Sequence, residues 1–308
     1  MQLPALAHIT EVGPRDGLQN ETRFMPTEEK VGMIEQLAAS GLREIEVTSF
    51  THPTWIPNLA DAEEVVRATR HLPVSAYALI PNKRGMERAQ RAGIEGMTFV
   101  FSATDGHNRR NLNRSTEDSL SEILDLHAAA GADGLRRRIS LSTVFGCPFE
   151  GAVPEARIQA IVARLVEGGC ERIGLCDTIG VADPVQVHRL ARALIARFPG
   201  VVFELHLHDT RGCALANTLA GLQAGIVHFD TAIGGLGGCP YAPGATGNVA
   251  TEDVVSMLEA MGVRTGIDQA LLLESDRRLA QWRGTPLDSA VWRVAQRCAP
   301  PASPSPGA

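Results

Sequence analysis

The chain has 308 residues, enough for one large domain or two ordinary ones, and 44% of them are hydrophobic and 21% charged. Values in this range are typical of globular proteins and exclude a fibrous repeat or extensive disorder. The formal net charge of −6 excludes a broad basic surface for nucleic acid. We interpret the one short basic run, Arg136, Arg137 and Arg138, as a solvated entry to a strand.

The sequence shows no recognisable targeting or membrane segment. Its apolar stretches stay short of the ~20 residues that a membrane helix needs. The first residues, MQLPALAHIT, lack the charged and apolar regions of a signal peptide. The six cysteines form no CxxC pair, and a chain of this length folds without disulfide staples. We therefore expect a cytoplasmic protein with free thiols.

Short runs rich in β-branched residues recur along the chain and predict eight strands. In chain order they are HITEV from His8, EIEVTSF from Glu44, VSAYALI from Val74, MTFVFS from Met97, ISLSTVFG from Ile139, RIGLCDT from Arg172, VFELHLHDT from Val202 and HFDTAIGG from His228. They begin on average about 31 residues apart, the length of one strand and one helix. Between them lie helical patterns such as TEEKVGMIEQLAASG from Thr27 and PEARIQAIVARLVEGG from Pro154.

This strict alternation predicts a parallel sheet, and eight is the number of strands that closes into a barrel. An open doubly wound sheet more often stops at five or six strands. We therefore predict an α/β fold, a single (β/α)8 or TIM-barrel domain over residues 1–298 that includes additional C-terminal helices. The last residues, 299–308, read APPASPSPGA and are predicted to be a disordered tail.

Catalytic groups of such barrels lie where the strands end. His206 and His208 are two residues apart in the seventh strand, so both side chains are expected to point to the barrel axis. Together with the Asp16 carboxylate and the Asn248 amide they form a mixed nitrogen and oxygen set, suited to Mg²⁺, Mn²⁺ or Co²⁺. The alternative is a pair of hydrogen-bonded histidines in a well-packed strand.

Three further ionisable residues lie in or just after the ends of predicted strands. Arg15 could form a salt bridge at the end of the barrel, or hold an enolate or carboxylate oxygen as a fixed cation. Glu46 is expected to face inward, where it could orient Arg15 or a metal-bound water. Asp177 could contact substrate or simply begin a helix.

A long glycine-rich stretch, GGLGGCPYAPGATGN, runs from Gly234 to Asn248. Long loops in compact domains are often lids or binding loops. A phosphate-binding loop is less favoured, because no GxxxxGK[ST] pattern is present. Cys239 in this stretch is our candidate for an acid/base or reactive thiol, although it could also be a loop cysteine without a role.

Several motifs together resemble the 3-hydroxy-3-methylglutaryl-CoA lyase family of the DRE-TIM metallolyases. They are EVGPRDGLQNE from Glu11, EVTSF, GCPFEG from Gly146, CDTIG, HLHDT followed by ALANTL, and GLGGCPYAPGATGNVATED. They span about residues 8–262 and keep the family's order. Their combination is far more specific than any single motif.

The resemblance implies cleavage of a 3-hydroxy-3-methylglutaryl-CoA-like thioester to acetyl-CoA and acetoacetate by a homodimer. It assigns the metal ligands to Asp16, His206, His208 and Asn248, the substrate-activating arginine to Arg15, the catalytic loop thiol to Cys239, the glutamate of the Asp-Arg-Glu signature to Glu46 and a further active-site acid to Asp177. By hypothesis, His206 or Asp16 takes the substrate's hydroxyl proton, Arg15 stabilises the thioester enolate, and Cys239 protonates it.

Two places depart from the family pattern. Arg211, Gly212 and Cys213 stand where Tyr-Gly-Gln is usual, and Ala232 to Gly235 replace the usual serine and valine after Thr231. We therefore retain, as an alternative substrate, an acyl-CoA with a different 3-hydroxyacyl group. Two alternative functions also remain, a Claisen-condensation acyltransferase of the isopropylmalate or citramalate synthase type and a non-catalytic barrel that binds acyl-CoA or metal.

Overall fold

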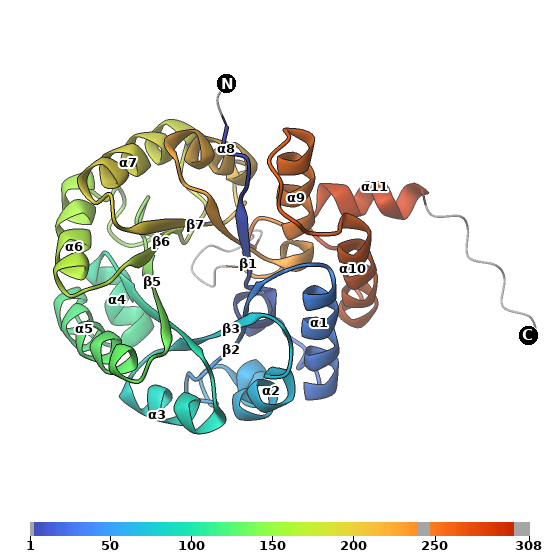
Figure 1. Ribbon diagram of the computed structural model, residues 1–308, viewed down its shortest axis with the longest axis horizontal. Helices are drawn as coiled ribbons and strands as arrows, with labels where there is room; N and C mark the ends of the chain where they lie inside the picture. Colours follow the sequence, from blue (N-terminus) through green and yellow to red (C-terminus); the bar gives the residue numbers. More distant parts are fainter. Residues whose placement is uncertain (1–2, 239–246, 299–308) are drawn as a thin grey trace, which may run out of the picture.

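The computed structural model describes residues 3–238 and 247–298, and in them eight parallel strands close into a barrel in sequence order (Figure 1). The strands are β1 (His8–Glu11), β2 (Glu44–Ser49), β3 (Ser75–Ile80), β4 (Gly96–Ser102), β5 (Arg136–Ser142), β6 (Arg172–Asp177), β7 (Val202–Leu207) and β8 (His228–Thr231). Each lies in a predicted run, except that β4 begins one residue and β5 three residues before the run. The predicted TIM barrel is confirmed.

Helices follow the strands and form an outer ring. They are α1 (Thr27–Ala39), α2 (Ala62–Thr69), α3 (Lys83–Ala92), α4 (Asp105–Leu112), α5 (Thr116–Ala132), α6 (Glu155–Glu167), α7 (Pro184–Arg197) and α8 (Ala214–Ala224), with short turns η1 (Gly13–Gly17), η2 (Pro57–Leu59) and η3 (Ile233–Gly235). In α6, Ile158, Ile161, Val162 and Leu165 are buried, so the helix covers the barrel with one apolar stripe. Gly225 ends α8 at φ 108°, a conformation that favours glycine.

Three more helices, α9 (Thr251–Ala260), α10 (Gln269–Arg283) and α11 (Ala290–Cys298), lie to one side of the ring. Helix α10 packs against α1 and α9, so the predicted C-terminal helices extend the barrel's core rather than form a separate layer. The tail predicted at 299–308 lies outside the described residues. None of the helices in the described part of the chain combines the length and apolar character that a membrane crossing needs.

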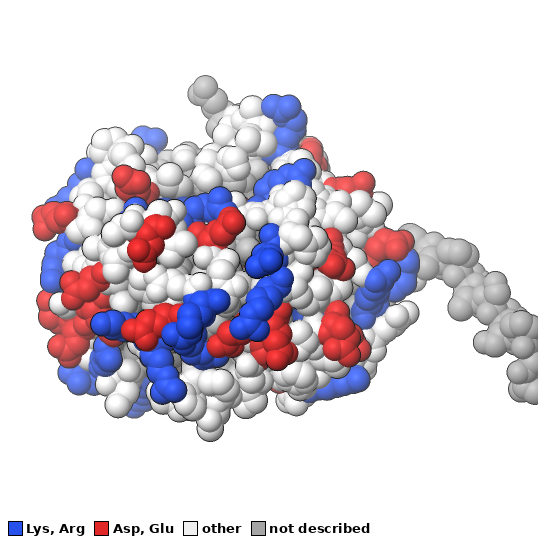
Figure 2. All heavy atoms as spheres, turned by 60° about the horizontal axis from the view of Figure 1, so that its bottom comes forward, with Lys and Arg blue, Asp and Glu red and all other residues white. Residues whose placement is uncertain are grey.

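Charged side chains of both signs are mixed on the face of the molecule shown in Figure 2. Lysine and arginine residues there lie beside aspartate and glutamate residues and do not gather into one broad basic patch. A polyanion such as nucleic acid binds mainly through a continuous basic surface. This face therefore agrees with the expectation drawn from the net charge of −6.

The inside of the barrel is polar, unlike the apolar layers usual in this fold. Arg138 is only 2% exposed and forms ion pairs with Glu46, Glu204 and Asp230 of three other strands. Our interpretation of the three arginines as a solvated strand entry is therefore wrong for Arg138, although Arg136 is exposed. Alternation turns Arg136 and Arg138 to the same side of β5, but Arg138 lies two residues further into the strand, among the carboxylates of Glu46, Glu204 and Asp230.

The four cysteines whose side chains the structure describes have free thiols, as expected. Cys147, Cys170 and Cys176 are buried and Cys213 is half-buried, and none of the four forms a disulfide. Burial raises the pKa of Cys176 to about 12, so this thiol stays protonated and unreactive at neutral pH.

Candidate active site

A tight π-helical turn, η1, places Arg15 and Asp16 at the carboxyl ends of the strands, which we call the barrel mouth. The backbone N–H groups of Arg15, Asp16 and Gly17 all lie within 3.3 Å of the carbonyl oxygen of Val12. Both side chains are almost fully buried, at 6% and 7% exposure. The sequence GPRDG thus turns two neighbouring charged side chains toward the barrel axis.

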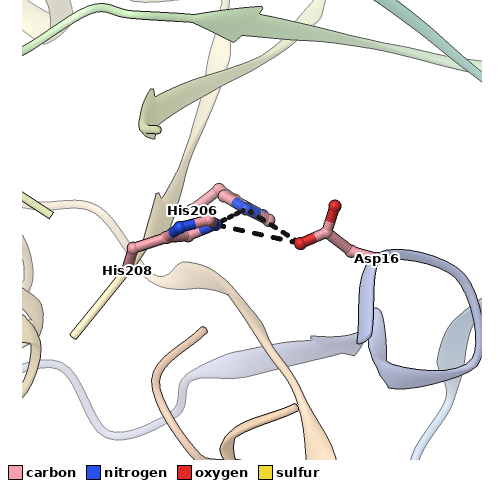
Figure 3. A group of neighbouring side chains, drawn as sticks. All are labelled: Asp16, His206 and His208. Atoms are coloured by element: carbon pink, nitrogen blue, oxygen red, sulfur yellow. Dashed lines mark hydrogen bonds and ion pairs between the residues drawn. The ribbon is translucent and has the colours of Figure 1, made fainter. Parts of the chain in front are cut away.

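Asp16 faces His206 of β7 and His208, the residue that directly follows this strand (Figure 3). Its Oδ2 atom lies 3.8 Å from Nε2 of His206 and 3.8 Å from Nε2 of His208. The two Nε2 atoms are 3.2 Å apart. The ligand atoms of all three residues lie within 4.8 Å of one another, which is the spacing of a cation site. The predicted convergence of these side chains is present.

Asn248 joins this group through the backbone and the side chain. It pairs with His208 in an isolated β-bridge, and its Nδ2 donates to Oδ2 of Asp16 at 2.7 Å and to the carbonyl oxygen of Leu236 at 3.1 Å. Its Oδ1 atom is buried without a hydrogen-bond partner among the described residues, as is Nδ1 of His208. Unpartnered buried polar atoms are costly. They argue against a pair of histidines whose hydrogen bonds are all satisfied, and the unpartnered Oδ1 of Asn248 fits an oxygen ligand for a cation.

The protonation states also fit a cation. Burial of the Asp16 carboxyl raises its pKa, but the charges of Arg15, His206 and His208 outweigh burial and lower the pKa to about 2. Burial and the charge of His206 lower the pKa of His208 to about 4. At neutral pH Asp16 is therefore a carboxylate and His208 a neutral imidazole, the forms that bind metal. Burial lowers the pKa of His206, but its hydrogen bond with Asp230 and the charge of Asp16 outweigh burial and raise it, so a cation must displace a proton from His206.

Arg15 is held by Glu46 of β2, one of the two roles considered for that glutamate. Nε of Arg15 donates to Oε1 of Glu46 at 3.0 Å, and another guanidinium nitrogen donates to Oδ1 of Asp16. Glu46 in turn accepts from Arg138 at 2.6 Å. Arg15 both forms salt bridges and lines the pocket, so its two proposed roles are compatible.

A cavity of about 430 Å³ opens over these residues, a size typical of small-molecule sites. Its lining includes all of Arg15, Asp16, His206 and His208, and side chains from the other strands, Leu79, Val100, Ser140, Ser142 and Cys176. Trp55, which also lines it, is 70% exposed. The departures at Arg211 to Cys213 and Ala232 to Gly235 do not line this cavity in the described part of the chain. They therefore give no direct reason for a different acyl group.

One predicted site residue, Asp177, does not join the group. Both carboxylate oxygens of Asp177 accept backbone N–H groups, from Val181 at 2.9 Å and Ala182 at 3.0 Å. Asp177 thus stabilises the loop before α7, whose N-terminus is capped by Asp183. This geometry lends no support to a catalytic role for Asp177. Cys239, the predicted loop thiol, lies outside the described residues.

The sequence interpretation missed Arg138, Glu204 and Asp230. Asp230 of β8 lies 3.2 Å from Nδ1 of His206 through its Oδ2 atom. Glu204 is two residues before His206, so strand alternation alone would have placed it inside the barrel. The partners of these residues come from distant strands and carry no local signal.

Comparison with known proteins gives a consistent result. The model of the family described as HMGL-like matches residues 7–278. A hydroxymethylglutaryl-CoA lyase of Bacillus subtilis is 47% identical over 94% of this chain and 97% of its own length. An (R)-citramalyl-CoA lyase of Chloroflexus aurantiacus is 40% identical over 93% of this chain and 94% of its own.

A solved structure extends the similarity to the fold. The crystallised HMG-CoA lyase of Acinetobacter baumannii, in complex with coenzyme A and 3-methylmalate, superimposes with a TM-score of 0.89. The two sequences are 36% identical, and the superposition covers 100% of each chain.

Proposed function

The chain belongs to the HMGL-like family, and from this premise we propose that it cleaves 3-hydroxy-3-methylglutaryl-CoA, or a closely similar 3-hydroxyacyl-CoA, to acetyl-CoA and a 3-oxo acid. The 3-oxo acid from the named thioester is acetoacetate. The enzyme is a lyase, as are its relatives from Bacillus and Chloroflexus. This excludes the non-catalytic barrel and does not favour the Claisen-condensation synthase.

The observation that carries the proposal is the placement of Arg15 beside the group of Asp16, His206 and His208 in one cavity. A cation at this group would be held by these three residues and by the amide of Asn248. When bound, it would polarise the hydroxyl and carboxylate oxygens of the acyl group. We propose Mg²⁺ or Mn²⁺, with Co²⁺ as a substitute, because the donors are nitrogen and oxygen rather than thiolate.

The chain's own residues account for the proton and charge movements. Loss of the 3-hydroxyl proton to Asp16, which lies in the cavity lining, turns C3 into a carbonyl as the C2–C3 bond breaks. The bonding electrons pass to C2 and form the thioester enolate. Arg15, held by Glu46 and permanently charged, stabilises the enolate oxygen. Cys239 is proposed to protonate C2 and so complete acetyl-CoA.

The acyl-CoA substrate is supported by the relatives' names and by the coenzyme A in the Acinetobacter structure. Because a relative of similar identity is a citramalyl-CoA lyase, the acyl group must be tested directly. A homodimer and a cytoplasmic location remain predictions from the sequence.

The test is a cleavage assay on the full chain with added Mg²⁺ or Mn²⁺ and a panel of 3-hydroxyacyl-CoA thioesters. The panel includes 3-hydroxy-3-methylglutaryl-CoA and citramalyl-CoA, and both acetyl-CoA and the released oxo acid are measured. We expect the highest kcat/KM with the first thioester and acetoacetate as its second product. Absence of cleavage with every thioester and both metals would refute the proposed function.

A further inference from the structure

We propose that Asp230, held in place by Arg138, is a positioning residue that fixes the ring tautomer of His206 and thereby sets the affinity of the site for its cation. The proposal rests on the proposed function in one respect, since it takes His206 as a metal ligand. It adds a role for two buried residues that are neither proposed metal ligands nor part of the cavity lining.

The first step is the contact between Asp230 and His206. Oδ2 of Asp230 lies 3.2 Å from Nδ1 of His206, on the side of the ring away from Asp16. A neutral imidazole carries one N–H group. If Nδ1 donates it to the Asp230 carboxylate, Nε2 keeps its lone pair and presents it to Asp16 and His208. Asp230 is 5% exposed, so water does not compete strongly for this contact.

The second step is the difference between the two histidines. Nδ1 of His208 is buried and has no hydrogen-bond partner among the described residues. Within residues 3–238 and 247–298, His206 alone of the pair therefore has a carboxylate at Nδ1 that selects its tautomer. We infer that His206 is the preoriented member of the pair and that the orientation of His208 depends on the packing around it.

The third step is the support of Asp230 itself. Its other oxygen, Oδ1, accepts from Arg138 at 2.7 Å, and Arg138 also donates to Oε2 of Glu46 at 2.6 Å and to Thr98 at 2.9 Å. A buried carboxylate needs such a partner to remain ionised. Glu46 also holds Arg15. Arg138 therefore contacts both the carboxylate that orients His206 and the carboxylate that orients Arg15.

A purely structural role for Asp230 is the rival explanation, and Glu204 provides the matched control. Glu204 is 2% exposed and pairs with the same Arg138, at 3.5 Å, and with Arg172. No hydrogen bond or ion pair links its carboxylate to His206, His208 or Asp16 among the described residues. If Asp230 only neutralised Arg138, Glu204→Gln and Asp230→Asn would have similar consequences.

The experiment measures Mn²⁺ binding by calorimetry on the full chain freed of metal, without substrate. We expect Asp230→Asn to weaken Mn²⁺ binding about 10- to 100-fold, the range for groups that orient metal-bound histidines. Glu204→Gln is expected to stay within about threefold of the wild type. Unchanged affinity in Asp230→Asn, or equal weakening in both variants, would overturn the proposal.

A second readout does not need metal. Nitrogen-15 NMR of the histidine rings in the metal-free wild type, recorded at a pH high enough for His206 to be neutral, should show His206 as the Nδ1–H tautomer, and Asp230→Asn should raise the Nε2–H population. If Asp230→Asn does not fold, Asp230→Glu keeps the carboxylate and should keep the tautomer. A wild-type His206 protonated on Nε2, or loss of the Nδ1–H tautomer in Asp230→Glu, overturns the proposal. A wild type that binds Mn²⁺ but cleaves no thioester refutes the proposed function alone.

Discussion

The Nε2 atoms of His206 and His208 lie 3.2 Å apart, and each lies 3.8 Å from Oδ2 of Asp16. Two lone pairs turned toward each other and toward a carboxylate repel one another unless a proton or a cation lies between them. The lowered pKa values of Asp16 and His208 disfavour protons on these two groups at neutral pH, whereas Asp230 and Asp16 raise the pKa of His206. A proton on His206 and a divalent cation are therefore the two species that relieve the repulsion, and they compete for this position.

Asp16→Asn is expected to weaken cation binding by more than the roughly 100-fold reached by changes outside the ligand set. The variant removes the only negative charge among the four proposed ligands and puts a neutral carboxamide of similar size in place of the carboxylate. Mn²⁺ calorimetry and acetyl-CoA release would both report the loss. Asp125→Asn, an exposed residue of α5, serves as the control and should match the wild type. Full activity of Asp16→Asn at low Mn²⁺ would contradict the assignment.

Arg15→Lys is expected to lower kcat about 10²- to 10³-fold while KM changes less. Lysine keeps the positive charge, but it cannot maintain the forked contact with Glu46 that aims the guanidinium into the cavity. Steady-state kinetics with the preferred thioester measure the effect. The control is Arg137→Lys, because Arg137 contacts the His127 carbonyl oxygen and does not line the cavity. Equal kinetics in the two variants would argue against a role for the Arg15 fork.

The stability of the protein is expected to fall as the pH rises, because of Asp276 in α10. Burial, with the charges of Glu252 and Glu11, raises the pKa of Asp276 from 3.8 to about 10. Between these values the folded carboxyl is protonated and the unfolded one is ionised, so folding takes up a proton. The contribution is fully present below about pH 4 and decreases as the pH rises toward about 10.

Asp276→Asn removes this titration. Its free energy of unfolding, measured by urea denaturation from about pH 6 to about pH 9, should fall less steeply than that of the wild type. Asp125→Asn should retain the wild-type slope, because Asp125 is exposed. Parallel curves for Asp276→Asn and the wild type would show that Asp276 does not titrate in this way.

Gly13→Ala is expected to destabilise the protein by about 1–3 kcal/mol and to weaken Mn²⁺ binding. A Cβ atom at Gly13 would lie 2.6 Å from Oε1 of Glu11 and 2.9 Å from Cγ2 of Ile233, so the turn that carries Arg15 and Asp16 would have to shift. Gly32→Ala is the control, since nothing lies within 4 Å of its Cβ and it sits in α1.

Gly32→Ala should stabilise the protein by about 0.5–1 kcal/mol and leave Mn²⁺ binding unchanged. Urea denaturation and Mn²⁺ calorimetry compare the two glycine variants. A Gly13→Ala protein as stable as the wild type, with unchanged Mn²⁺ affinity, would show that the turn tolerates a side chain.

The sequence by itself determined the barrel and the residues at its mouth. Eight β/α units are a local pattern that repeats, and closing them into a ring is the usual arrangement for that number. The inward direction of His206 and His208 follows from alternation along one strand. Arg15 and Asp16 are neighbours in the chain, so one turn after β1 places both.

The tertiary structure alone decided which charged residues support this group. Arg138 meets Asp230 and Glu46, each 92 positions away in the chain, and no pattern within β5 distinguishes it from the exposed Arg136. Asp177 likewise lies at the carboxyl end of a strand, as the last residue of β6, but its carboxylate turns to two backbone N–H groups of the loop that follows. The physical reason is that strand alternation gives a side chain its direction, whereas its charge partner depends on which distant strands the closed barrel brings within hydrogen-bond distance.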